Sequence, residues 1–170
     1  VGVARGMKYL HDHSIIHSNL KPCNILLNSE FRPLITDYGL SKNLGGTKSY
    51  QAPEILKGEK YDGKVDVYAF GILMFEVLND SFAYPDYLNG KMADSDFQSK
   101  VVNENYRPEF TFPIKTSLKK LIEKCWSNNP DDRPSFDEIF EKLSNTQIED
   151  SEESENYLLD DVDVDELNFY

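Results

Sequence analysis

Histidine and cysteine are the side chains of this sequence that most readily bind metals or act as nucleophiles. His11 and His13 stand two residues apart at the end of a helical pattern, so they share no helix face, and no third ligand accompanies them. We therefore expect a polar exit from the helix and no metal pair. Cys23 and Cys125 form no disulfide framework, and no signal-peptide pattern is present. A reducing setting, cytoplasmic or nuclear, fits best.

A polar loop and two short apolar runs follow. The loop IIHSNLKPCN (residues 15–24) is closed by Pro22, and the runs ILLN (25–28) and PLIT (33–36) are separated by a turn-like segment. This pattern predicts a two-stranded hairpin. An acidic-aromatic-glycine string at residues 37–39 follows directly after the second strand of this hairpin.

The loop and the string after the hairpin are the first of five motifs that together resemble a known protein family. Five motifs resemble parts of eukaryotic protein kinases, in the order in which that family has them. HSNLKPCN (17–24) resembles the catalytic loop, DYG (37–39) the DFG motif, and GTKSYQAPE (46–54) the end of the activation segment. DVYAFG (66–71) resembles the buried large-lobe helix, and CWSNNPDDRPSF (125–136) resembles the Arg-bearing final loop. One such string alone is common, whereas five in family order are specific. The resemblance covers nearly everything from Val1 to Leu143 and points to the tyrosine-kinase-like branch. It implies a mainly α fold, the kinase large lobe, with a central buried helix and a short β-hairpin that carries the DFG-like motif.

By resemblance, the chain would take part in phosphoryl transfer from ATP, with Mg²⁺, to a serine or threonine of a protein substrate. Asn24 and Asp37 would hold Mg²⁺, since amide and carboxylate oxygens suit a hard cation. The plain alternative is that Asn24 orders a turn and Asp37 ends a strand. Lys21 would hold a positive charge over the phosphate, and Thr47 would place the acceptor hydroxyl. Both favour serine/threonine specificity, although a plain surface role remains the alternative for each.

Two positions depart from the family pattern. Asn19 stands where the family has the aspartate that accepts the substrate's proton; a carboxamide cannot accept it, so we expect an impaired catalyst. Ser18 replaces the arginine that would bind a phosphorylated activation segment (residues 40–51), which disfavours gating by phosphate. A Gly-rich loop and a strand lysine are missing from the sequence. We therefore expect a piece of a longer protein whose small lobe lies upstream, weak or inactive by itself.

The stretch VDVYAFGILMFEVL (65–78) is the element that must support these groups. Its centre carries no charge, and a helix with no polar face is expected to be buried. It is too short to span a membrane, and Asp66 and Glu76 close it at its two ends. Gly71 indicates that another backbone packs close to the helix.

Further architectural roles follow from the resemblance. Asp66 would accept hydrogen bonds from the loop backbone near His17. Glu54 and Arg133 would form a buried ion pair that ties the activation segment to the last helices. His17 and Tyr38 would stack toward the small lobe.

Helix boundaries can also be predicted. Apolar spacing indicates a helix over residues 1–12. Thr116 or Ser117 is expected to cap a helix, and Ser135 with Glu138 fits a capping box that opens the last one.

Charge is distributed unevenly along the chain. Residues 149–170 contain ten Asp and Glu and no Lys or Arg, whereas the rest balances eighteen basic against twenty acidic residues. Neither part has the basic face that nucleic-acid binding requires, so neither nucleic acid nor a membrane is an expected partner. We expect a kinase large lobe over residues 1–146 and an acidic, disordered tail over residues 147–170.

The sequence is compatible with three functions. The first is a protein kinase of reduced activity that acts on a protein substrate. The second is a pseudokinase, in which the same fold serves as a docking or allosteric scaffold. The third is an interaction fragment that works through the acidic tail.

Overall fold

The computed structural model describes residues 1–39 and 47–146. Its elements are α1 (Gly2–Asp12), η1 (Pro22–Asn24), β1 (Ile25–Leu27), β2 (Pro33–Ile35), η2 (Lys48–Tyr50), α2 (Pro53–Leu56), α3 (Lys64–Asn79), α4 (Pro85–Leu88), α5 (Asp94–Asn103), α6 (Thr116–Cys125), η3 (Pro130–Asp132) and a last helix over residues 136–146. The predicted mainly α fold with one short hairpin is confirmed. The predicted tail and most of the predicted short activation segment lie outside the described residues.

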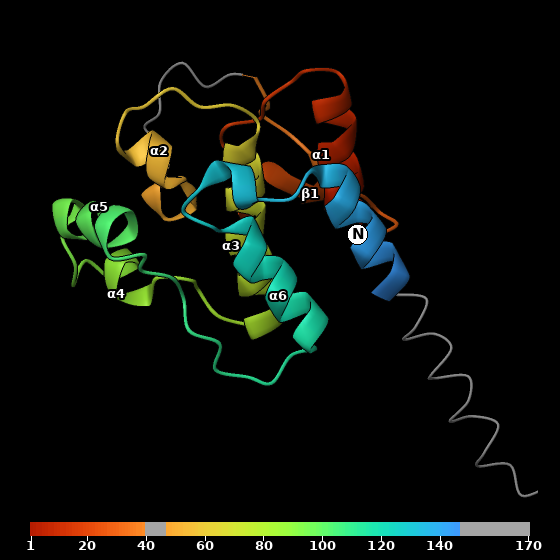
Figure 1. The fold of residues 1–170 in the computed structure, drawn as a ribbon. Coiled ribbons are helices and arrows are strands. Elements are labelled where there is room, and N and C mark those ends of the chain that lie inside the picture. Colours follow the sequence, from red (N-terminus) through yellow and green to blue (C-terminus); the bar gives the residue numbers. More distant parts are fainter. Residues whose placement is uncertain (40–46, 147–170) are drawn as a thin grey trace, which may run out of the picture.

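Helix α3 runs through the middle of the molecule. Figure 1 shows α1 and the last helix on one side of it, and α2, α4 and α5 on the other. Every residue from Val65 to Phe75 is buried, which follows from a sequence with no polar face. The last turn differs from the prediction, because Val77 is 72% exposed. The helix ends at Asn79, and the Asp80 that follows it has a left-handed φ of 46°.

Gly71 lies where α3 meets α6. A Cβ atom built on Gly71 would stand 2.8 Å from the Cβ of Cys125 and 3.3 Å from the backbone nitrogen of Trp126. Only a residue without a side chain allows this approach without a shift of the neighbouring helix. The predicted close backbone neighbour is confirmed.

The hairpin pairs β1 with β2 in antiparallel register, with Leu26 opposite Leu34. The Asn28 side chain closes the turn by accepting the backbone N–H groups of Glu30 (3.0 Å) and Arg32 (2.9 Å). Leu26 and Leu34 are 53% and 51% exposed. The hairpin therefore presents an apolar pair to the surface beside the predicted site.

The capping predictions had mixed outcomes. The Ser135 hydroxyl accepts the N–H of Glu138 (3.2 Å), and the Glu138 carboxylate accepts the N–H of Ser135 (2.7 Å), so the capping box is confirmed. Helix α6 instead begins at Thr116 with Lys115 in the N-cap position. The predicted cap by Thr116 or Ser117 is wrong.

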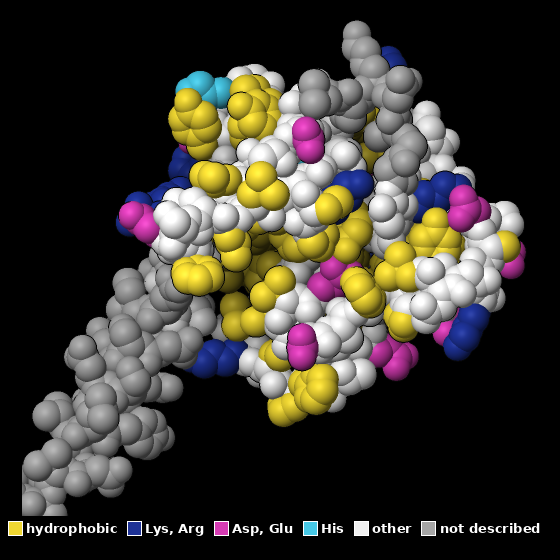
Figure 2. Space-filling view, turned by 180° about the vertical axis from the view of Figure 1, so that it is seen from behind, with side chains coloured by type: hydrophobic (Ala, Val, Ile, Leu, Met, Phe, Trp, Pro, Cys, Tyr) yellow, Lys and Arg dark blue, Asp and Glu magenta, His cyan; other side chains and the backbone are white. Residues whose placement is uncertain are grey.

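The rear face of the molecule carries an apolar groove. Figure 2 shows hydrophobic side chains gathered in a hollow between α1 and α3. The groove measures about 270 Å³ and is lined by Val1, Val3, Phe70, Leu73, Met74, Val77, Leu78, Leu118, Leu143 and Thr146. None of the described helices is long and apolar enough to cross a membrane.

Candidate active site

Asp66 joins the buried helix to the loop that carries the predicted catalytic residues. Its carboxylate accepts the backbone N–H groups of His17 (2.8 Å) and Ser18 (2.7 Å), and only 1% of its side chain is exposed. A buried carboxylate is stable only when donors compensate it. The contact predicted between Asp66 and the loop backbone is present, and it fixes the loop to the first turn of α3.

A third donor to Asp66 was not predicted. The imidazole Nε2 of His11 lies 2.9 Å from the Asp66 carboxylate. His13, by contrast, is exposed and contacts only the carbonyl of Tyr9 in its own helix (2.8 Å). The predicted polar helix exit therefore describes His13 and is wrong for His11.

Asn24 ends the loop and begins the hairpin. Its side-chain Nδ2 donates to the carbonyl of Asn19 (2.8 Å), and its own carbonyl accepts the N–H of Thr36 (3.0 Å). Asn24 thus orders a turn, as the plain alternative held. The bond uses the amide nitrogen, however, and within the described ranges its Oδ1 accepts no hydrogen bond. The oxygen that would bind a cation remains available.

Asp37 stands at the same end of the hairpin, because it follows Thr36, the partner of Asn24. Its φ is +59°, in the left-handed region that non-glycine residues adopt at a cost and that is common at functional sites. The residue is exposed. In the part of the chain that the structure describes, its carboxylate makes no hydrogen bond or ion pair.

His17 and Tyr38 differ in environment. His17 is fully buried; its Nδ1 accepts the N–H of Asn19 (3.4 Å), and its Nε2 has no partner among the described residues. Tyr38 is 47% exposed. The ring contacts found between described residues do not include this pair, so the predicted stacking toward a small lobe stays a prediction.

Asn19 and Thr47 are far apart in sequence but line one small pocket. Tyr50 lines the same pocket. Its hydroxyl donates to Glu76 (2.6 Å), whose second oxygen accepts the N–H of Ala83 (2.9 Å). Burial, and then the bond to Glu76, raise the pKa of Tyr50 far above its ordinary value. The segment that follows Thr47 is thereby fixed to α3 through Glu76, a role that its sequence position at the end of an apolar run did not reveal.

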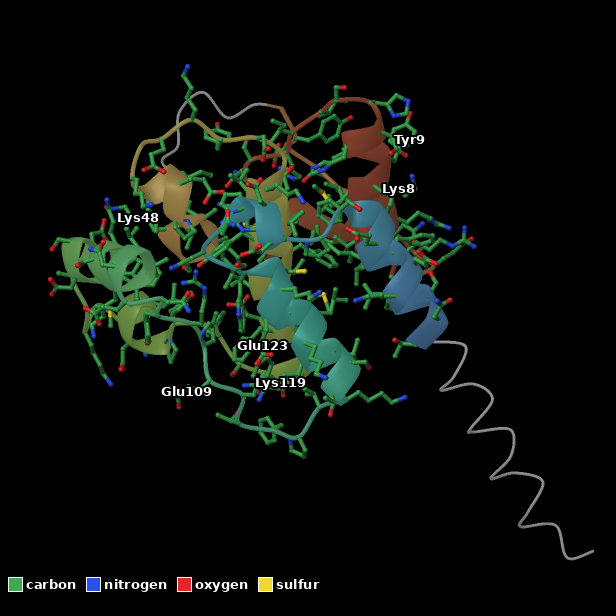
Figure 3. All side chains as sticks on the ribbon, viewed as in Figure 1. Lys8, Tyr9, Lys48, Glu109, Lys119 and Glu123 are labelled. Carbon is green, nitrogen blue, oxygen red and sulfur yellow. The ribbon has the colours of Figure 1, made fainter. Side chains whose placement is uncertain are left out.

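Lys21 and Lys48 have different surroundings. Lys21 is partly exposed on an extended backbone at the start of η1. Lys48 binds Asp94 of α5 (2.8 Å), and Tyr87 donates to the same carboxylate (3.0 Å). These bonds, first the one from Lys48, lower the pKa of Asp94. Figure 3 shows Lys48 on the side of the molecule that carries α5.

The Glu54–Arg133 pair lies beneath the site. The guanidinium donates to both carboxylate oxygens, at 2.6 and 2.9 Å, and neither side chain is more than 8% exposed. The remaining N–H groups of Arg133 donate to the carbonyls of Ser127 (2.9 Å), Lys64 (3.0 Å) and Asn128 (3.4 Å). The buried ion pair is present, and every donor of the guanidinium is used.

The donor set at the hairpin end suits Mg²⁺. No group of three or more His, Cys, Asp or Glu side chains with metal-binding geometry occurs within residues 1–39 and 47–146. A magnesium ion that keeps water and phosphate oxygens as ligands needs only one or two protein oxygens. The exposed carboxylate of Asp37 and the Oδ1 of Asn24 meet that requirement.

The buried helix, the loop anchored on it and the hairpin that ends in Asp37 together define a protein-kinase large lobe. The family model described as "Protein kinase domain" matches residues 1–143. This chain belongs to the protein kinase domain family.

Named relatives agree with this assignment. The chain is 38% identical over 147 residues to RGS domain-containing serine/threonine-protein kinase A of Dictyostelium discoideum, covering 82% of this chain and 12% of that protein. It is 35% identical over 157 residues to dual specificity protein kinase shkD of the same organism, covering 86% and 21%. It is 36% identical over 146 residues to serine/threonine/tyrosine-protein kinase HT1 of Arabidopsis thaliana, covering 81% and 36%. The chain thus spans only a minor part of each relative.

Proposed function

We propose that this chain is the large-lobe part of a serine/threonine-type protein kinase of the tyrosine-kinase-like branch, slowed by Asn19. The observation that carries the proposal is the bond from Asn24 Nδ2 to the Asn19 carbonyl, because it holds the loop against the hairpin while leaving Asn24 Oδ1 for a cation. The names of the relatives, which include serine/threonine and dual-specificity kinases, support the substrate class.

The chain's own groups divide the work of phosphoryl transfer. Asn24 and Asp37 would hold Mg²⁺, which when bound neutralises charge on the phosphates of ATP. Lys21 would place its ammonium against the transferring phosphate. The transition state of this reaction is loose, so most of the protein's contribution is positioning and charge neutralisation.

Asn19 accounts for the reduced rate. It shares a pocket with Thr47, so both can orient an acceptor hydroxyl. A carboxamide cannot accept the proton of that hydroxyl, and the loss of a general base typically costs about 10²–10⁴ in rate. Because the loose transition state needs the base only late, the lower end of this range applies.

A scaffold without catalysis is the second candidate. Asn19 and Ser18 favour it. With these residues the loop lacks both the general base and the arginine that would bind a phosphorylated activation segment. For either candidate we propose a reducing, cytoplasmic or nuclear, compartment, in keeping with free Cys23 and Cys125. The partner is a protein, as a substrate in the first case and as a docked partner in the second.

The deciding experiment compares three forms of the full-length protein that contains this chain: wild type, Asn19→Asp, and Asp37→Ala as the metal-loss control. We expect all but Asp37→Ala to bind Mg²⁺-nucleotide tightly, and Asn19→Asp to transfer phosphate about 10²-fold faster than wild type. If nucleotide binds and Asn19→Asp gives no increase, the missing base is not what limits the rate. If the wild type binds no nucleotide, the scaffold function is correct.

A further inference from the structure

The apolar groove on the rear face is a surface that the proposed function does not use. Among the described residues, its lining shares none with the pocket of Asn19 and Thr47. Val77 and Val1 line the groove and are 72% and 38% exposed, and Figure 2 shows hydrophobic side chains gathered in the hollow. Apolar side chains that gather in one exposed patch mark a surface for another group.

The size of the groove indicates what kind of group it takes. Sites for small molecules usually measure roughly 300–1,000 Å³. The groove, at about 270 Å³, lies below that range. It therefore suits a few apolar side chains of a chain segment better than a small-molecule ligand.

The chain itself leads to this groove. Thr146, the last residue of the last helix, is one of the lining residues, and residues 147–170 follow it in the sequence. About a dozen residues separate Thr146 from Leu158, and an extended segment of that length spans about 40 Å. The apolar residues from Leu158 onward can therefore reach every part of the groove. A short tether also holds them at an effective concentration on the order of millimolar, so a weak contact suffices.

The acidic tail (residues 147–170) carries its apolar residues in one stretch. Leu158 and Leu159 are adjacent, and two valines then alternate with aspartates in VDVD (162–165). In an extended segment, alternation places the valines on one face and the carboxylates on the other. Such a segment can bury its apolar side chains while its acids stay in solvent.

The walls of the groove bear positive charges. Arg5 follows Val1 by one turn of α1, with its N–H donating to the Val1 carbonyl (3.0 Å), and it is exposed. Lys142 precedes Thr146 by one turn, with its carbonyl accepting the Thr146 hydroxyl (2.9 Å), and it is also exposed. Lys115 is the N-cap residue of α6, and neither α1 nor α6 has an acidic residue in its first turn. These cations favour an acidic occupant over a basic one.

From these observations we propose that the groove is the docking site of the acidic tail of this same chain. Leu158 and Leu159 enter the groove, and the aspartates that follow them face the cations on its walls. The docked tail leaves the pocket of Asn19 and Thr47 open, so docking fixes the tail without closing the candidate active site. The inference is independent of phosphoryl transfer.

Two exposed side chains provide a matched pair of probes. Val77 is 72% exposed and lines the groove, whereas Phe82 is 69% exposed and does not line it. Val77→Cys and Phe82→Cys each place a thiol at one of these positions in the full-length protein that contains this chain. The rate at which a maleimide labels each thiol reports whether the position is covered. Mass spectrometry of the peptides separates both thiols from exposed Cys23.

We expect Val77→Cys to be labelled about tenfold more slowly than Phe82→Cys, because burial of one leucine side chain corresponds to a tenfold or larger factor in a docking equilibrium. Adding Leu158→Ser/Leu159→Ser should raise the labelling rate of Val77→Cys to that of Phe82→Cys. Asn156→Ser/Asn168→Ser is the matched control in the tail, because it removes no apolar group. It should leave Val77→Cys slow.

Three outcomes of the labelling experiment would overturn the proposal. The first is equal labelling of the two thiols when the tail is unchanged. The second is slow labelling of Val77→Cys that persists with Leu158→Ser/Leu159→Ser, because a segment before Val1 or a separate partner then covers the groove. The third is slow labelling that disappears on dilution, which assigns the groove to a second copy of the chain.

Hydrogen exchange in the tail measures the same contact from its other side. We expect Val77→Glu, which places a negative charge in the groove, to speed exchange of the amides at 158–164 about tenfold. Phe82→Glu should match wild type. Both positions are exposed, so neither change should disturb the core. Tail exchange in Val77→Glu equal to that of wild type would show that the tail does not dock in this groove.

Discussion

The two sides of the site differ in how completely their charges are satisfied. On the inner side, the Asp66 carboxylate accepts three hydrogen bonds and the Arg133 guanidinium donates five, and both side chains are buried. On the outer side, Asp37 is exposed with no partner among the described residues, and Leu26 and Leu34 present apolar surface.

This difference separates structural from chemical charges. A charge that holds the fold must be satisfied by the protein itself, because an unpaired buried charge is strongly destabilising. A charge that binds a ligand must stay available, so a protein partner for Asp37 would work against the Mg²⁺-binding role that we propose for it. Changes on the inner side should therefore affect stability strongly, and changes on the outer side weakly.

Replacing Arg133 by Ala should have the largest effect, lowering the free energy of unfolding by about 3–5 kcal/mol, because it strands the Glu54 carboxylate in the core. Denaturant unfolding of Arg133→Ala and of the Arg133→Ala/Glu54→Ala double variant measures this. The double variant should lose much less than the sum of the two single changes. Arg32→Ala, which breaks an exposed pair with Glu30, is the control. A loss from Arg133→Ala as small as that of the control would contradict the buried pair.

Gly71→Ala should come next, with a loss of about 1–3 kcal/mol from overpacking between α3 and α6. Helix propensity alone predicts the opposite sign, a gain of about 1 kcal/mol. The sign of the change in unfolding free energy therefore decides the matter. Stabilisation would mean that the 2.8 Å approach to the Cys125 Cβ does not exist in solution.

Ser135→Ala should cost about 1 kcal/mol by removing the cap of the last helix. Backbone and side-chain bonds from Ser135 lower the pKa of Glu138 in the folded state. A lowered folded pKa stabilises the protein above about pH 4.3, the ordinary glutamate value, and this contribution is lost as pH falls through the folded pKa. Unfolding measured across this range should show a smaller pH dependence in Ser135→Ala, because the hydroxyl bond to the Glu138 carboxylate is lost while the backbone N–H bond is kept. An unchanged profile would rule out the hydroxyl bond.

Leu34→Ser should have the smallest effect, within about 0.5 kcal/mol in the 170-residue chain, because half of the side chain is already exposed. Ile35→Ser is the matched control on the opposite face of β2, where the Ile35 side chain reaches the backbone of Gly6 in α1. It should cost clearly more. Equal losses at the two positions would show that the hairpin does not lie on α1 as described.

The sequence alone predicted the elements whose signal is local or carried by motifs. The uncharged run at residues 67–75 could only be buried, and the turn between two apolar runs predicted the hairpin. The motifs added pairings between distant positions, such as Glu54 with Arg133 and Asp66 with the loop, because the family resemblance carries tertiary information that periodicity does not.

The tertiary structure decided what depends on neighbours distant in sequence. His11 and His13 look alike in the sequence, and only the packing of α1 against α3 makes one a partner of Asp66, 55 residues away, and leaves the other at the surface. Val77 belongs to the same apolar run as the core residues, yet it is exposed because the described elements do not cover the last turn of α3. A hydrogen bond or a burial requires a second surface, and a sequence pattern describes only the first.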